Sequence, residues 1–250
     1  MKIVIIGGTG LIGSNVAQKL GRLGHTVVAG SPSTGINTLT GEGVAEALTG
    51  ADVVIDLANA PAFDEATAVS FFETAGHNLL AAEKEAGTKH HLALSIVGVD
   101  EMGEMGYMRA KKVQEDIIRE SGVPYTIIRS TQFQEFVPAI TGGSTQGNEV
   151  HVSKVAFQPI AAEDVAAFVA QFALGVPANG IEEIAGPDRG FMSTFVETYV
   201  KETGDTKVVI PNDRNEYFGA VIPQAALAPK GEAHLGKIRF EQFIESSLVK

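Results

Sequence analysis

The sequence predicts an α/β fold built on a doubly wound parallel sheet, followed by a small C-terminal lobe. Strand-like apolar runs alternate five times with helical patterns before the rhythm changes near residue 130. The chain opens with a run of β-branched residues, passes through closely spaced glycines and enters a helical pattern. At 250 residues it is long enough for one large core, so we expect a single domain over residues 1–250.

The expected elements follow from apolar periodicity and from the glycines and prolines at their ends. Strands are expected at residues 3–6, 25–30, 52–57, 92–98, 125–129, 149–157, 181–185 and 207–210. Helices are expected after residue 13 and at residues 43–48, 62–85, 107–121, 162–174, 195–202 and 240–248. Residues 142–147 are expected to form a flexible loop, and residues 215–236 either a mobile lid or a packed irregular loop.

Composition excludes several classes of function. The net charge of −11 argues against a nucleic-acid partner, because no cluster of basic residues can displace counterions. The absence of cysteine excludes disulfides and thiolate catalysis. No apolar run reaches the ~20 residues that span a bilayer, so we expect a cytoplasmic location without a membrane partner. No metal is expected, because the adjacent His90 and His91 would point to opposite faces of a strand.

The glycine-rich turn predicts a dinucleotide site. Its glycines have the spacing Gly8-x-Gly10-x-x-Gly13, after a buried strand and before a helix. Such glycines permit the turn, let a pyrophosphate approach the backbone and let helix and strand pack closely. A purely structural turn is the alternative. The cofactor-binding residues expected here are Gly7, Thr9, Gly10, Leu11, Ile12 and Gly13. Residues 1–130 would then form the cofactor core, and residues 131–250 would add mixed core elements and the substrate lobe.

The loop after the second expected strand favours NADP(H) over NAD(H). An acidic residue normally binds the ribose 2′-hydroxyl of NAD about 20 residues past the glycines. Here Ser31 and Ser33 stand in that region instead, and their hydroxyls could surround a 2′-phosphate. The arginine that often reads this phosphate is also missing. Asn59, at the outlet of the third expected strand, is assigned to lining the cofactor.

Three further polar residues are expected near the cofactor edge of the sheet. Tyr107 and Lys111 lie four residues apart, which places them one turn apart on one face of a helix. Ser95 lies near the end of the fourth expected strand. The plain alternatives are a serine bonded to a neighbouring carbonyl, a solvated lysine and a tyrosine packed on the surface.

Together with the glycine motif, this set resembles the short-chain dehydrogenase/reductase superfamily, and within it the atypical NmrA-like NAD(P)-binding branch. The resemblance is carried by the segments at residues 7–13, 94–98, 106–111, 124–129 and 158–166. It implies a Rossmann fold with Tyr107 as general acid, Lys111 bonded to the nicotinamide ribose and Ser95 holding the substrate carbonyl. A cation at Lys111 would also lower the pKa of the Tyr107 phenol.

We therefore expect an NADP(H)-dependent oxidoreductase acting on a small ketone, aldehyde or quinone, or on the corresponding alcohol. The alternatives are a non-catalytic NADP(H)-sensing regulator and a non-redox isomerase or dehydratase on the same fold. The outlet of the fifth expected strand supplies the substrate-binding candidates Gln132, Phe133 and Phe136. No unpartnered apolar helix face points to an oligomeric state.

Overall fold

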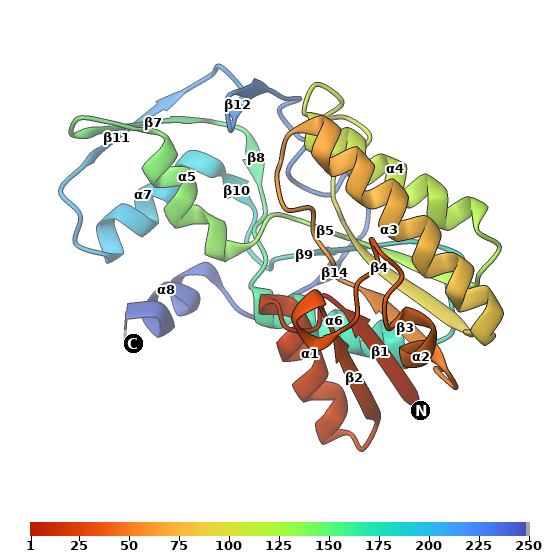
Figure 1. Ribbon diagram of the computed structural model, residues 1–250. Helices are drawn as coiled ribbons and strands as arrows, with labels where there is room; N and C mark the ends of the chain where they lie inside the picture. The colour runs from red at the N-terminus through yellow and green to blue at the C-terminus, as the bar shows by residue number, and fades with distance from the viewer. Residues whose placement is uncertain (249–250) are drawn as a thin grey trace. The chain divides into compact units, whose positions relative to one another are not determined.

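The computed structural model describes residues 1–248 and contains two compact units (Figure 1). The first unit comprises residues 1–95, 105–129 and 165–182, and the second comprises residues 96–104, 130–164 and the described residues from 183 onward. The chain thus enters the second unit first at residue 96 and again at residue 130, and it returns to the first unit at residues 105 and 165.

The elements begin and end as follows. The α-helices are α1 (Leu11–Arg22), α2 (Val44–Leu48), α3 (Glu65–Ala86), α4 (Gly106–Glu120), α5 (Val137–Gly143), α6 (Ala162–Ala173), α7 (Met192–Glu202) and α8 (Phe240–Leu248). Short 3-10 helices are η1 (Pro32–Thr34) and η2 (Gln134–Phe136). The longer strands are β1 (Lys2–Ile6), β2 (Thr26–Gly30), β3 (Val53–Asp56), β4 (His90–Ile96), β5 (Tyr125–Ser130), β7 (Glu149–Ser153), β9 (Gly180–Ala185) and β11 (Val208–Asn212). The two-residue strands are β6 (Thr145–Gln146), β8 (Ala156–Phe157), β10 (Gly190–Phe191), β12 (Glu216–Tyr217), β13 (Ala220–Val221) and β14 (His234–Leu235).

The main sheet has seven strands in the order β14-β9-β5-β4-β3-β1-β2, which confirms the predicted doubly wound α/β fold. Strand β1 pairs in parallel with both β2 and β3, and β3 pairs in parallel with β4. The order reverses between β1 and β3, because the chain runs outward from β1 to β2 and then crosses back to β3. In open α/β sheets such a switch point leaves a crevice at the carboxyl ends of the two strands. The outlets of β1 and β3 therefore define where a ligand can enter.

Helices α3 and α4 lie side by side and pack on one face of the sheet in the first unit (Figure 1). Leu80 of α3 and Ile118 of α4 share a buried cluster with Ala93 and Ile127 of the strands beneath them. Burying apolar side chains of this size stabilises the fold by about 1.5–3 kcal/mol each. Tyr107, near the start of α4, is thereby held at the same end of the sheet as the strand outlets.

At the turn after β1, backbone segments contact each other without intervening side chains. A Cβ atom added at Gly13 would lie 2.3 Å from the carbonyl oxygen of Gly7 and 2.7 Å from Cα of Gly8. Gly7 itself has a φ of +75°, and a Cβ atom there would lie 2.6 Å from the carbonyl oxygen of Leu57. Only glycine permits these approaches, so α1 begins directly beside the outlets of β1 and β3.

The second unit departs from the expected elements in several places. Helix α5 and the short η2 occupy a stretch that was expected to be irregular. Residues 142–147, expected as a flexible loop, instead close α5 and form β6, which pairs antiparallel with β7. Helix α7 begins at Met192, earlier than the expected residue 195. Within residues 215–236, β12 and β13 form a hairpin, and Tyr217 and Leu227 are buried.

Among residues 1–248, no helix is both long enough and apolar enough to cross a membrane. The same residues contain no cluster of histidine and carboxylate side chains that could hold a metal ion.

The glycine contact predicts a sharp contrast between two substitutions in α1. Gly13→Ala should destabilise the protein by about 2–3 kcal/mol, because the new methyl group meets rigid backbone. Gly21→Ala, in the same helix, has no atom within 4 Å of the new Cβ and should stabilise the protein by about 0.5–1 kcal/mol. Urea unfolding of both variants measures the difference, and equal effects would contradict the backbone contact.

Candidate active site

The start of α1 forms an open cradle for a phosphate group. Gly10 is the N-cap residue, and no side chain caps the helix. Thr9, Gly10 and Leu11 are exposed, whereas Ile12 and Gly13 are buried against the turn. The amide groups of a helix's first turn carry a partial positive charge, which attracts phosphate. The residues present therefore fit the pyrophosphate of a dinucleotide.

The outlet of β2 lies against the same turn. A Cβ atom at Gly8 would lie 2.7 Å from Cα of Ala29, so the backbone of β2 runs directly beside the glycines. The following residues form η1, and Oγ of its N-cap residue Ser31 lies 2.8 Å from Oγ of Ser33. Ser31 is buried and Ser33 is exposed. The two predicted serine contacts are thus brought together as one hydroxyl pair at the end of β2.

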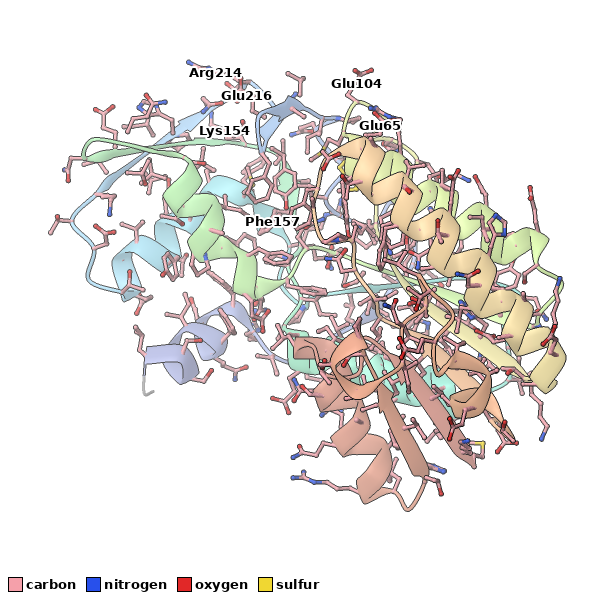
Figure 2. All side chains as sticks on the ribbon, viewed as in Figure 1. Glu65, Glu104, Lys154, Phe157, Arg214 and Glu216 are labelled. Atoms are coloured by element: carbon pink, nitrogen blue, oxygen red, sulfur yellow. The ribbon has the colours of Figure 1, made fainter. Side chains whose placement is uncertain are left out.

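Tyr107 lies in the first turn of α4, where α4 approaches α3 closely. A Cβ atom at Gly106 would lie 2.5 Å from Cβ of Glu65, the first residue of α3. Arg109 forms a two-pronged ion pair with the Glu65 carboxylate, including an Nε to Oε1 hydrogen bond of 2.6 Å. Glu65 is labelled in Figure 2 at that end of α3. These contacts fix the start of α4 and hence the backbone position of Tyr107.

The Tyr107 hydroxyl donates a 2.5 Å hydrogen bond to Oδ1 of Asn59. Asn59 lies just beyond β3, two residues after the Leu57 carbonyl that contacts Gly7. The tyrosine ring packs edge-on against Phe63, with centroids 5.1 Å apart, and against Phe72 at 6.2 Å. Burial raises the pKa of Tyr107 to about 12. The phenol is therefore protonated at neutral pH, and its raised pKa makes it a weaker acid than a solvated tyrosine.

Lys111 forms its hydrogen bonds with residues other than Tyr107. Its ammonium donates to the Leu94 carbonyl at 2.8 Å and to Oε1 of Gln114, and lies 4.7 Å from the centre of the Phe72 ring. Gln114 in turn donates to Asp56 at 2.9 Å. No hydrogen bond joins Lys111 to Tyr107 in the described part of the chain. The expected lowering of the Tyr107 pKa by Lys111 is accordingly wrong for this structure, in which burial raises that pKa.

Ser95 is also engaged inside the protein. It is 2 % exposed, and its Oγ donates a 2.6 Å hydrogen bond to Oε1 of Glu115. Glu115 is 1 % exposed and is neutralised by Arg129, at 2.9 and 2.6 Å, and by Arg119 at 2.8 Å. A contact between Ser95 and a substrate carbonyl, as the resemblance implies, would require the hydroxyl to leave this carboxylate.

The predicted substrate-binding residues lie in the second unit. Gln132 is buried, and its Oε1 accepts a 2.9 Å hydrogen bond from the Tyr217 hydroxyl. Phe133 and Phe136 stack on each other with centroids 5.4 Å apart, and Phe136 is exposed. A cavity of about 360 Å³ in this unit has Tyr217 and Phe218 in its lining. Gln132 is thus joined to the cavity wall through Tyr217.

A family model described as NAD(P)H-binding matches residues 7–174, which is more than half of the chain. The chain belongs to this NAD(P)H-binding family. The match begins at the glycine turn and includes α1, α4 and β5.

Two curated relatives of this NAD(P)H-binding protein have different roles. The photosystem II assembly factor Ycf39 of Synechocystis is 28% identical over 149 residues, which cover 54% of this chain and 46% of the relative. A (4-alkanoyl-5-oxo-2,5-dihydrofuran-3-yl)methyl phosphate reductase of Streptomyces griseus is 28% identical over 144 residues, covering 52% and 48%. The match spans about half the length of each relative.

Solved structures share the fold over the whole chain. A dTDP-4-dehydrorhamnose reductase from Bacillus anthracis in complex with NADP has a TM-score of 0.74 and 13% identity, covering 99% of this chain and 98% of that one. An NADPH-dependent quinone oxidoreductase from Escherichia coli has a TM-score of 0.68 and 15% identity, covering 98% and 99%.

Two parts of this site were not anticipated from the sequence. The first is the pairing of Asn59 with Tyr107, since Asn59 was assigned only to the cofactor. The second is the Glu115 cluster beneath Ser95. Arg129 in an apolar strand was an available signal for that cluster, because a buried guanidinium requires a carboxylate partner.

The burial of Lys111 predicts a pH-dependent contribution to stability. Burial lowers the pKa of Lys111 to about 8 from its ordinary 10.5. Between these values the unfolded chain binds a proton that the folded chain has lost, so stability rises with pH. The wild type should gain up to about 3 kcal/mol relative to Lys111→Met between pH 8 and pH 10.5.

Urea unfolding of both proteins across this pH range measures the effect. Lys112→Met, which removes the neighbouring lysine, serves as the control and should follow the wild type. Parallel pH profiles for the wild type and Lys111→Met would show that the ammonium keeps its proton in the folded state.

Proposed function

We propose that this chain is an NADP(H)-dependent oxidoreductase of the short-chain dehydrogenase/reductase type, in its NmrA-like branch. It would transfer hydride between nicotinamide and a small ketone, aldehyde or quinone, or the corresponding alcohol. The observation that carries the proposal is the protonated Tyr107 phenol beside Asn59, at the strand outlet that contacts the glycine turn. A proton donor beside the cradle for a hydride-carrying cofactor is the pairing that carbonyl reduction requires.

The proposed reaction balances around the substrate carbonyl. When bound, the reduced cofactor supplies a hydride to the carbonyl carbon. Tyr107 donates its proton to the carbonyl oxygen as negative charge develops there, and the resulting phenolate takes a proton from solvent. Phe63 and Phe72 pack edge-on against the ring and hold it in place, while the hydroxyl stays close enough to solvent to regain its proton.

The preference for NADP(H) is supported by the hydroxyl pair of Ser31 and Ser33 at the end of β2. No carboxylate occupies residues 31–35 to repel a 2′-phosphate. Hydroxyl groups can donate hydrogen bonds to its oxygens. The substrate would be a small molecule, and a cytoplasmic location stays a prediction from the sequence.

The main alternative is a protein that senses NADP(H) without turnover. Its support is that Ser95 and Lys111 are both buried in internal contacts. Such a protein would bind NADPH and leave it unoxidised with every carbonyl compound. A non-redox isomerase or dehydratase is the third possibility, and it would convert its substrate without net oxidation of the cofactor.

Replacing the proposed acid should separate binding from chemistry. Tyr107→Phe is expected to lower kcat for carbonyl reduction at least ~100-fold while leaving the Kd for NADPH within about twofold. Steady-state assays and fluorescence titration measure the two quantities. Tyr125→Phe is the matched control and should retain activity. Tyr125 is the first residue of β5, at the end of the strand away from the strand outlets. An unchanged reduction rate in Tyr107→Phe would remove the assigned role.

A negative charge at the end of β2 should reverse the coenzyme preference. Ser33→Asp is expected to weaken NADPH binding at least ~10-fold through repulsion of the 2′-phosphate, with little change for NADH. Ser70→Asp, on the exposed side of α3, introduces the same charge elsewhere and should leave both affinities unchanged. Equal weakening of NADPH and NADH by Ser33→Asp would show that this loop does not face the 2′ position.

A further inference from the structure

We propose that the Asn59 side-chain amide, and not the Ser95 hydroxyl, donates the second hydrogen bond to the substrate's carbonyl oxygen, beside the bond from Tyr107. The inference rests on the proposed oxidoreductase function. It assigns to Asn59 a direct contact with the reacting group, in place of a role confined to the cofactor.

Ser95 cannot serve both its present partner and a substrate. A serine hydroxyl carries one proton, and Ser95 donates it to the buried Glu115 carboxylate at 2.6 Å. Hydrogen bonds to charged groups contribute about 1.5–3 kcal/mol, so breaking this one opposes substrate binding. Glu115 holds two arginines as well, which fixes the carboxylate in place. Ser95 is thus part of the structure that supports α4.

The orientation of the Asn59 amide is determined by its neighbours. Oδ1 accepts the backbone N–H of Ala60 at 2.9 Å and the hydroxyl of Tyr107 at 2.5 Å. Because a backbone N–H requires an acceptor, the oxygen end of the amide must face Ala60. The Nδ2 group has no hydrogen-bond partner within residues 1–248, and Asn59 is exposed. Its two N–H groups are therefore available to a ligand next to the phenol.

The surroundings of Tyr107 place an incoming carbonyl oxygen beside Asn59. Phe63 and Phe72 pack edge-on against the tyrosine ring, whereas the hydroxyl points to Asn59. An oxygen that accepts the phenol proton must displace or share the bond to Oδ1. A carbonyl oxygen has two acceptor sites and can bind the phenol and one Nδ2 hydrogen together.

The second donor would act where charge develops. As hydride reaches the carbonyl carbon, the oxygen becomes negative and its hydrogen bonds strengthen. Asn59 Nδ2 donates without losing a proton, and Tyr107 transfers the proton that completes the alcohol. Removing one such donor typically lowers kcat by about 10²–10³-fold. The expected effect is therefore on kcat, with the affinity for cofactor nearly unchanged.

Asn59→Asp is the decisive variant, because aspartate has the same shape and retains the oxygen that accepts from Ala60 and Tyr107. If Asn59 only positioned Tyr107, kcat would fall only as far as the added negative charge raises the pKa of the Tyr107 phenol. If Asn59 donates to the substrate, kcat at saturating NADPH falls at least ~100-fold near pH 7. It then recovers partly toward acid pH, as the carboxyl takes a proton and regains a donor.

The assay uses menadione, benzaldehyde and cyclohexanone as carbonyl probes, with NADPH in excess and the full chain. Asn59→Ala should lose kcat to the same extent at every pH. Fluorescence titration with NADPH and urea unfolding confirm that each variant is folded and binds cofactor.

The outcomes separate the inference from the proposed function. If Tyr107→Phe is inactive but Asn59→Asp reduces the probes at the wild-type rate, the inference fails and the oxidoreductase function stands. If the wild type oxidises no NADPH with any probe, or Tyr107→Phe is fully active, the proposed function fails and the inference falls with it.

Discussion

The contact of three backbone segments without intervening side chains is the constraint on which the site depends. The outlet of β1, the start of α1 and the outlet of β3 meet at Gly7, Gly13 and Leu57. A Cβ atom at either glycine would separate them. The contact brings the positive end of a helix next to the outlet of β3, where Asn59 lies, and so places a phosphate cradle and a proton donor at one edge of the sheet.

Buried polar networks then fix α4 relative to the sheet. Glu115 bonds to Arg129 of β5 and to Ser95 of β4, and Gln114 links Lys111 to Asp56 of β3. Buried charges contribute little to net stability, because their desolvation offsets their attraction. The geometry of these hydrogen bonds is nevertheless specific, because each bond forms only when both side chains are in the right position. They determine the register of α4, and the register of α4 determines where Tyr107 emerges.

The first half of the fold was predicted well because the signals for its elements lie within short stretches of sequence. Apolar runs and the glycine spacing identified β1 to β5 and the turn at Gly13. Helix α5 was missed because its helical residues are few and Gly142 and Gly143 lie at its end, which favoured a loop. The partners of Ser95 and Lys111 depend on side chains from other elements, which spacing along one chain does not reveal. The identity of the site residues therefore indicated a type of chemistry. Only the packing of the fold showed which of their polar groups are already bonded inside the protein.

The close approach of α3 and α4 at Gly106 also bears on how the segment around Tyr107 is interpreted. Gly106 and Tyr107 are adjacent, yet one serves the contact with Glu65 and the other faces Asn59. A sequence pattern that includes both residues therefore combines two separate requirements. The glycine lets the two helices pack closely, and the tyrosine supplies a reactive group. The two can diverge independently: a protein of this fold could replace the phenol and keep its helices together, and it would still match the glycine half of the pattern.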